Sequence, residues 1–89
     1  MAWFARRPAP SAPVTIENLE WIGRNAFAFA NTHIVMECMP DGSEGVLKWP
    51  WYLNNQHDRV AKFAARCGYK IEPLPFEHMV YHRARITPL

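Results

Sequence analysis

The stretch that most constrains the fold runs from Asn55 to Gly68, because the start signal, the apolar spacing and the stop signal of a helix coincide there. Asn55 is a favourable N-cap, since its side-chain oxygen can accept from the free N–H groups of the first turn. Gly68 supplies the stop, because glycine readily takes the left-handed conformation that closes a helix. Between these signals, apolar residues fall at i, i+3, i+4 and i+7, namely Val60, Phe63, Ala64 and Cys67. The sequence therefore predicts an amphipathic helix that needs an apolar surface to pack on.

The length of 89 residues allows one small core and no second one. Hydrophobic residues make up 49% of the chain and charged residues 20%, which is far from the composition of disordered proteins. Three prolines between positions 8 and 13 remove hydrogen-bond donors and favour an extended backbone. We therefore expect residues 1–13 to form a proline-rich extended arm and residues 14–89 to form a single α+β domain.

Two segments ahead of this helix show the alternation of strands. Residues 14–22 alternate except at Asn18, which we interpret as a bulge or a short break in a strand. Residues 26–30 alternate strictly between phenylalanine and alanine and give the clearest strand signal in the chain. The same phase continues to Met39, so one long bent strand or two short ones are expected before that residue.

The remaining elements complete a small sheet. Residues 40–43 have reverse-turn chemistry and predict a hairpin to a strand at 46–49. After the helix we expect a short strand at 69–72, ended by the two prolines that follow, and a last strand at 78–86. A helix is the alternative for this last element, because Phe76, Met79, Val80 and Ala84 also fit helical spacing. The predicted fold class is α+β, with an antiparallel sheet of about four strands, one helix on one face, and the order strand, strand, strand, helix, strand.

The tip of the arm carries the first candidate binding residues. Two large aromatic side chains ahead of a stiff spacer suit docking in a groove of a partner, and the two arginines that follow suit its rim. The alternative is that the aromatic side chains fold back onto the domain's own core. The residues concerned are Trp3, Phe4, Arg6 and Arg7.

The predicted helix carries a second stripe, formed by Arg59, Lys62 and Arg66. Three cations on one side suit either phosphates or an acidic patch of another protein, and the alternative is an ordinary solvated face. Joined with other residues, the stripe would make a cationic and aromatic surface for RNA or single-stranded DNA. That alternative nucleic-acid site comprises Arg59, Lys62, Arg66, Lys70, Tyr81, Arg83 and Arg85.

Residues 49–53 place three aromatic side chains around a proline. We interpret this cluster as a lid on the core, with a surface for nucleobases or a proline-rich peptide as the alternative.

Signs of catalysis are few, because Cys67 would lie at a helix C-terminus, where the dipole disfavours a thiolate. The spacing of His78 and His82 suits a zinc site on a helix but not on a strand. We expect free thiols at both cysteines, no metal, no cofactor and no enzymatic activity.

These observations lead to a hypothesis of function. We expect a non-enzymatic protein-binding module, an accessory subunit or inhibitor of viral, mobile-element or cellular origin, that docks on a larger protein assembly through its arm and its basic helix face. The alternative is a small nucleic-acid-binding domain. No apolar run approaches the length that crosses a bilayer, and the first residues lack the apolar core of a secretory signal, so we expect no membrane association and a cytoplasmic location.

Overall fold

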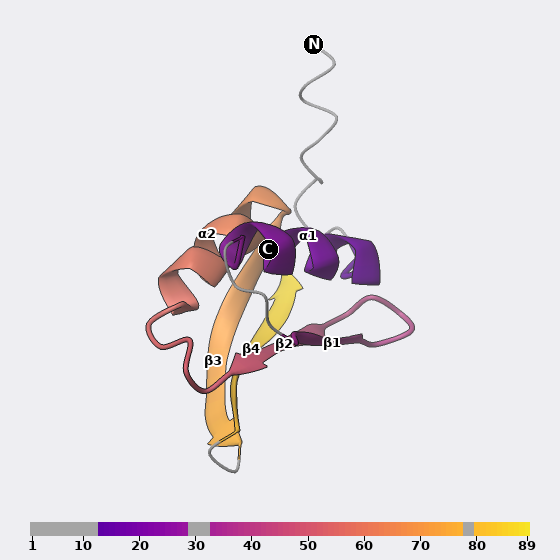
Figure 1. Cartoon of the computed structure of the whole chain (residues 1–89). Coiled ribbons are helices and arrows are strands. Elements are labelled where there is room, and N and C mark those ends of the chain that lie inside the picture. The colour runs from indigo at the N-terminus through magenta and orange to yellow at the C-terminus, as the bar shows by residue number, and fades with distance from the viewer. Residues whose placement is uncertain (1–12, 29–32, 78–79) are drawn as a thin grey trace.

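The computed structural model describes residues 13–28, 33–77 and 80–89 (Figure 1). Its elements in chain order are α1 (Ile16–Ala26), β1 (Val35–Cys38), β2 (Gly45–Pro50), α2 (His57–Arg66), β3 (Tyr69–Glu77) and β4 (Tyr81–Pro88). All strand pairs are antiparallel, and the order across the sheet is β1-β2-β4-β3. The α+β class and the four-stranded antiparallel sheet are thereby confirmed. The described chain has two helices where the sequence predicted one.

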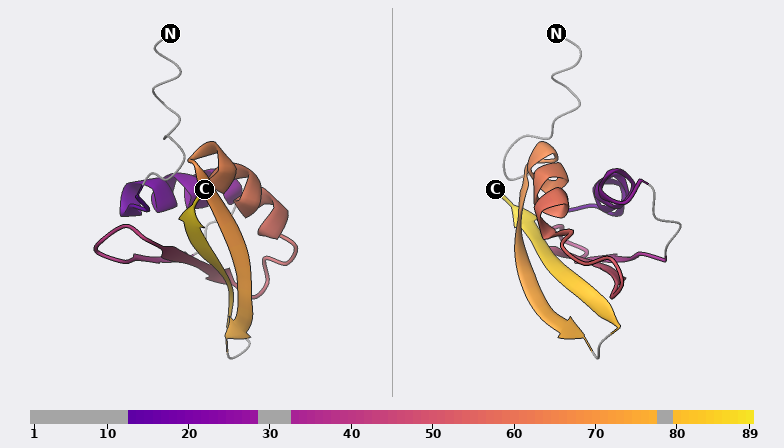
Figure 2. Two further views of the ribbon diagram at one scale, coloured as in Figure 1. Left: turned by 180° about the vertical axis from the view of Figure 1, so that it is seen from behind. Right: turned by 60° about the vertical axis from the view of Figure 1, so that its left-hand side comes forward.

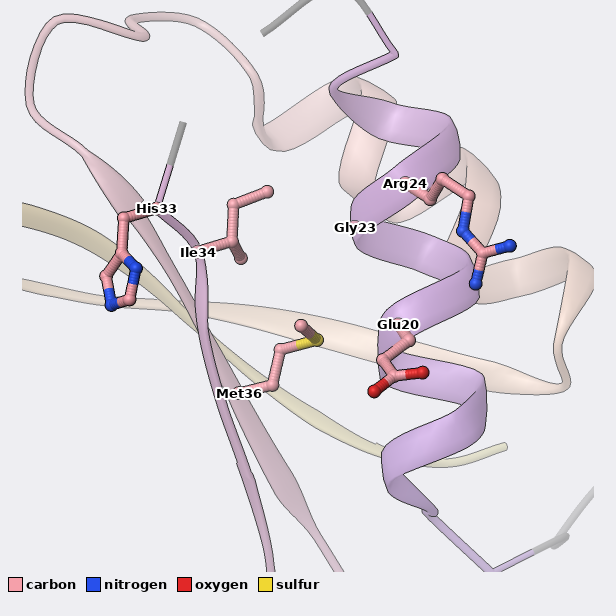
Figure 3. Close-up of a pocket in the computed structure, with 6 residues that line it drawn as sticks. All are labelled: Glu20, Gly23, Arg24, His33, Ile34 and Met36. Carbon is pink, nitrogen blue, oxygen red and sulfur yellow. The ribbon is translucent and has the colours of Figure 1, made fainter. Parts of the chain in front are cut away.

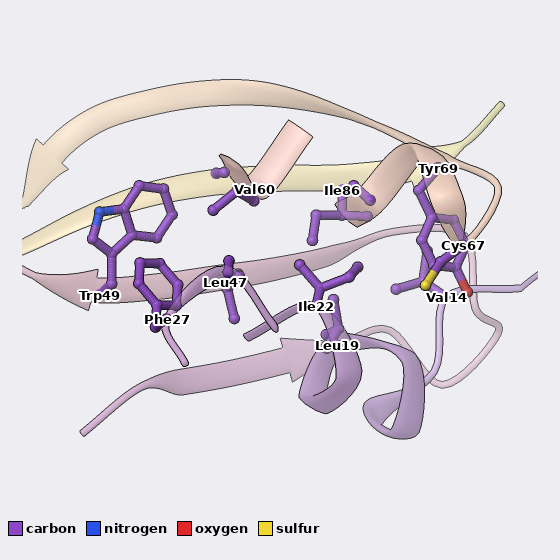
Figure 4. Close-up of a cluster of buried hydrophobic side chains, with 13 residues drawn as sticks. Val14, Leu19, Ile22, Phe27, Leu47, Trp49, Val60, Cys67, Tyr69 and Ile86 are labelled. Atoms are coloured by element: carbon purple, nitrogen blue, oxygen red, sulfur yellow. The ribbon is translucent and has the colours of Figure 1, made fainter. Parts of the chain in front are cut away.

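Both helices pack against the same face of the sheet (Figure 2). Leu47 of β2 lies opposite Ala84 of β4, and both side chains belong to the core shared with the two helices. The largest fully buried side chains are Trp49, Tyr69, Leu19, Ile22, Leu47, Ile86, Val14 and Val60 (Figure 4). The order helix, strand, strand occurs twice along the chain, and the two halves meet where β2 pairs with β4.

The strand predicted at residues 14–22 is wrong, because most of this segment belongs to α1. The Thr15 hydroxyl caps the helix by accepting from the Asn18 N–H at 3.2 Å. The break in the apolar alternation at Asn18 therefore reflects the spacing of a helix and not a β-bulge. Four buried residues show this period on the face that meets the sheet, namely Leu19, Ile22, Gly23 and Ala26.

The strand predicted at residues 26–30 is also wrong where the chain is described. Ala26 is the last residue of α1, and Phe27 follows it as the C-cap. The Phe27 ring is buried against Trp49, with 5.5 Å between the ring centroids. Residues 29–32 lie outside the described residues. At Ala26 and Phe27 the alternation thus coincides with the end of a helix, where one aromatic side chain reaches the core.

The hairpin predicted around residues 40–43 is confirmed, and it joins β1 to β2. The Ser43 N–H donates to the Asp41 carboxylate at 3.0 Å, which lowers the pKa of that carboxyl group. Gly42 has a φ of 72°, in the left-handed region that favours glycine. Of the alternation predicted to continue to Met39, the described strand covers Val35–Cys38.

The organising helix is confirmed as α2, with a corrected start. The residue that caps α2 is Gln56, whose side chain makes no capping hydrogen bond, whereas Asn55 lies before the helix with a φ of 60°. Gly68 ends the helix with a φ of 85°, as predicted. Of the predicted apolar stripe, Phe63 alone is only half-buried, and it packs edge-on against Trp21 of α1 at 5.4 Å.

Of the two strands after α2, β3 lies at the edge of the sheet and β4 lies between β3 and β2. β3 continues through Pro73 and Pro75 to Glu77, so the prediction that these prolines end it is wrong. An edge strand tolerates proline, because an N–H on its outer side has no ladder partner. The final predicted strand is confirmed as β4, although it begins at Tyr81 and the predicted residues 78–79 lie outside the described residues.

Candidate interaction surface

Four exposed apolar side chains lie at one end of the sheet, where β2 leads into α2 and β3 turns into β4. Their exposed fractions are 57% for Trp51, 52% for Tyr52, 47% for Phe76 and 45% for Val80. We call these four residues the distal patch. The Trp51 and Tyr52 rings meet edge to face at 5.6 Å, and the Trp51 N–H donates to the Val80 carbonyl at 3.0 Å. This hydrogen bond ties the loop after β2 to the hairpin of β3 and β4.

The imidazole of His82 supports the distal patch from beneath. Its Nε2 lies 3.1 Å from the Trp51 carbonyl and 3.2 Å from the Asn54 amide oxygen. Both of these groups are acceptors, so Nε2 carries the proton and donates. The ring stacks on Phe76 at 4.7 Å with an interplanar angle of 1°, and on Trp49 at 5.9 Å. His82 therefore links the backbone of the loop after β2 to the Phe76 ring of β3.

A cavity of about 290 Å³ opens beside this histidine, lined by Trp49, Asn54, Asn55, His57, Asp58 and His82. The His57 ring meets Trp49 edge-on at 4.9 Å, and its buried Nδ1 has no hydrogen-bond partner within the described residues. Burial lowers the pKa of His57 below its ordinary value, and the nearby His82 lowers it further, while Asp58 raises it. The neutral imidazole is thus favoured at this position.

The geometry assigns no reaction to the two histidines. Their ring centroids are 6.5 Å apart. Across the described ranges, no group of three or more histidine, cysteine or acidic side chains is placed to hold a metal ion. Cys38 and Cys67 both have free thiols, and burial raises the pKa of the Cys67 thiol. This end of the sheet therefore combines the exposed apolar distal patch with the hydrogen-bonded imidazole of His82.

The predicted arm residues Trp3, Phe4, Arg6 and Arg7 lie outside the described residues. The predicted basic stripe does lie on a helix, and its members are all exposed: Arg59, Lys62 and Arg66. Spacings of three and four residues place their side chains on one side of α2. The Arg66 guanidinium lies 5.1 Å from the centroid of the Phe63 ring, so the stripe borders the seam between α2 and α1.

The structure does not bring the alternative nucleic-acid residues onto one surface. His82, Ala84 and Ile86 face the helices, so Arg83 and Arg85 between them point to the opposite face of the sheet. By the same alternation, Tyr81 and Lys70 belong to that opposite face. The predicted set therefore divides into a stripe on α2 and a separate group on the face of the sheet that the helices do not cover, which we call the open face.

The charges on the open face are partly balanced by neighbours. The Arg85 guanidinium lies 3.6 Å from the Glu72 carboxylate and 3.9 Å from that of Glu44. Arg83 donates from Nε to the Pro75 carbonyl at 3.0 Å. The ion pairs offset the charge of Arg85, and the hydrogen bond engages Nε of Arg83, so the α2 stripe is the more open cationic surface of the two.

The distal patch was only partly visible in the sequence. The lid interpretation of residues 49–53 holds for Trp49, which is fully buried, but Trp51 and Tyr52 are exposed. No pattern in the sequence indicates that His57 meets His82, because the two residues belong to different elements. The stacking of Phe76 on His82 likewise depends on the irregular pairing between Leu74 and Glu77.

Comparison with protein family models, with curated proteins and with solved structures finds no match for this chain. Among the described helices, none is both long and apolar enough to pass through a lipid bilayer.

Proposed function

We propose that this chain is a non-enzymatic protein-binding module, an accessory subunit or inhibitor, which docks on a larger protein through the distal patch. The observation that carries the proposal is the joint exposure of Trp51, Tyr52, Phe76 and Val80 beside His82, which bonds to the Trp51 carbonyl and stacks on Phe76. Tryptophan and tyrosine are frequent anchors of protein interfaces. The Phe76 ring, which stacks on His82, loses little conformational freedom on binding, and this favours affinity.

The basic stripe of α2 and the arm residues, which the sequence predicted to bind a partner, extend this proposal. His57 lines the cavity beside the patch and begins α2, so Arg59 follows within the same turn of helix. The α2 stripe would then meet acidic groups of the partner and speed the encounter, while the patch supplies the apolar anchor. The arm residues Trp3, Phe4, Arg6 and Arg7 would add a second anchor to the same partner.

The experiment that tests the patch is affinity capture of partners by the full chain from its native cell, with and without nuclease. The test variant is Trp51→Ser combined with Tyr52→Ser. The matched control is Met39→Ser, since Met39 is 49% exposed but lies in the hairpin between β1 and β2. We expect the control to recover a defined protein partner and the test variant to lose it, with both variants showing wild-type circular dichroism.

Two results would contradict the proposal. The first is capture of the same partner by the Trp51 and Tyr52 variant, because the patch would then be dispensable. The second is loss of every captured protein on nuclease treatment, because nucleic acid would then bridge the chain to those proteins.

The second candidate function is nucleic-acid binding, and the exposed cations on one side of α2 favour it. Its test is fluorescence anisotropy with a labelled single-stranded RNA over a range of salt concentrations. If Arg59, Lys62 and Arg66 contact phosphates, changing all three to alanine should weaken binding and reduce the salt slope by about 2. The matched control is Arg83→Ala on the opposite face. Equal weakening by the control would show that the α2 stripe is not the specific binding surface, and a salt-independent affinity would rule out binding through phosphates.

A further inference from the structure

A groove runs between α1 and the edge strand β1, and none of its lining residues belongs to the distal patch. Its volume is about 430 Å³, and it is lined by Glu20, Gly23, Arg24, His33, Ile34 and Met36. The Ile34 and Met36 side chains point toward α1, whereas the His33 ring points away from it (Figure 3). Ile34 and Met36 also pack against the buried core, so they form an apolar floor.

The main chain of β1 presents hydrogen-bonding groups beside this floor. The Met39 N–H donates to the Glu44 carbonyl at 2.9 Å, in register with the pairing of β1 and β2. In an antiparallel ladder, every second residue of a strand directs its backbone N–H and C=O groups toward the neighbouring strand, and the residues between direct theirs to the opposite side. Met39 bonds to β2's side of the hairpin, and Glu37 and Val35 follow the same phase. Met36 and Cys38 therefore direct their N–H and C=O groups to the outer edge, where the described sheet has no further strand.

The opposite edge of the sheet is less suited to a new strand. β3 contains Pro73 and Pro75, which have no N–H to donate. The Pro75 carbonyl already accepts from Arg83 at 3.0 Å. Prolines on an edge strand are a common protection against pairing with other chains. Of the two edges of the described sheet, β1 is the one open to strand addition.

We propose that β1 and the α1 groove bind an extended segment of another protein, which adds to the sheet as a fifth strand. A polypeptide is the occupant because it alone offers N–H and C=O groups at the repeat of the β1 edge. Alternate side chains of the added strand lie over Ile34 and Met36 and are apolar. Gly23 lines the groove on the α1 side.

The charges on the rim define the rest of the peptide. Glu20 and Arg24 are exposed on successive turns of α1, and within the described part of the chain neither has an ion-pair partner. The bound segment therefore carries a basic residue toward Glu20 and an acidic residue toward Arg24. A second copy of this chain fits less well, because pairing of β1 with itself about a two-fold axis would bring the two Glu37 carboxylates close together.

The experiment begins with selection of a phage-displayed library of random 12-residue peptides on the full chain. A selected peptide is then titrated into isotopically labelled protein, and amide shifts and hydrogen exchange are followed by NMR. We expect shifts along β1 and α1, slowed exchange at Met36 and Cys38, and alternating apolar residues in the selected peptides. Glu20→Lys should weaken binding at least tenfold. Glu17→Lys, an exposed change on the same helix outside the groove, should alter affinity less than twofold.

Several outcomes would overturn this proposal. Selected peptides that shift Trp51, Tyr52 and Phe76 and leave β1 unchanged would place peptide binding at the distal patch. Equal weakening by Glu17→Lys and Glu20→Lys would show a general charge effect. A dimer in sedimentation experiments, with Met36 and Cys38 already protected before peptide is added, would identify a second copy as the occupant. Because the distal patch is not part of the groove, failure here leaves the Trp51 and Tyr52 test unaffected.

Discussion

Replacing Gly23 by alanine should stabilise this chain, because Gly23 lies in the interior of α1 and the added methyl group has room. A Cβ built at Gly23 would lie 3.8 Å from the Ile34 Cδ1 and 3.8 Å from the Leu47 Cδ1, both ordinary contact distances. Glycine inside a helix costs roughly 0.5–1 kcal/mol relative to alanine. We therefore expect the free energy of unfolding to rise by about 0.5–1 kcal/mol.

The measurement is urea unfolding followed by tryptophan fluorescence, since the buried Trp49 reports on the core. For a small domain with an m-value near 1 kcal/mol per molar urea, the midpoint should rise by roughly 0.5–1 M. Circular dichroism on the same samples checks that helix content is kept.

The matched control is Gly42→Ala, for which the opposite sign is expected. Gly42 has a φ of 72°, and a Cβ there would lie 2.5 Å from the Pro13 Cβ. The left-handed conformation alone costs a residue with a side chain about 1–2 kcal/mol, and the clash adds to that cost. If Gly23→Ala leaves the midpoint unchanged or lowers it, the helical setting and the free space assigned to Gly23 are refuted.

Two further predictions concern buried polar groups. Tyr69→Phe should cost about 1–2 kcal/mol in urea unfolding, because the hydroxyl donates to the Pro13 carbonyl and accepts from the Asn18 amide, both at 2.7 Å; Tyr52→Phe, at an exposed ring, should cost nothing measurable, and equal effects would contradict the reasoning. Since the pKa of His57 is lowered on folding, the unfolded state binds this proton more readily, so stability should fall as the pH drops below about 6.5. Unfolding at pH 7.5 and 5.5 should show a smaller loss for His57→Gln than for the wild type, and an unchanged loss would show that other groups set the pH dependence.

The sequence predicted correctly the elements whose signals are local. The apolar spacing of α2 and the stop at Gly68 lie within a few residues of one another, and both are found in the structure. The hairpin around Gly42 depends on a turn that its own residues specify. Such elements need little help from the rest of the fold, and so the α+β class and most of the sheet could be predicted.

The failures arise where distant residues decide the structure. Residues 14–22 contain β-branched side chains and partial alternation, yet α1 forms because Leu19 and Ile22 find a buried surface on the sheet. Likewise, Pro73 is accepted in β3 only because that strand lies at an edge. The distal patch could not be assembled from sequence, since His82 reaches Trp51 only through the pairing of β2 with β4.

The doubled order of helix, strand and strand has a consequence for folding. Each half is one uninterrupted stretch of chain, with its own hairpin formed between near neighbours in sequence. The halves are joined by the pairing of β2 with β4 and by the contact of α1 with α2, which link residues far apart along the chain. Contacts of this kind form late because they close long loops. The two hairpins should therefore form first, and their docking into a common sheet should set the rate at which the domain folds.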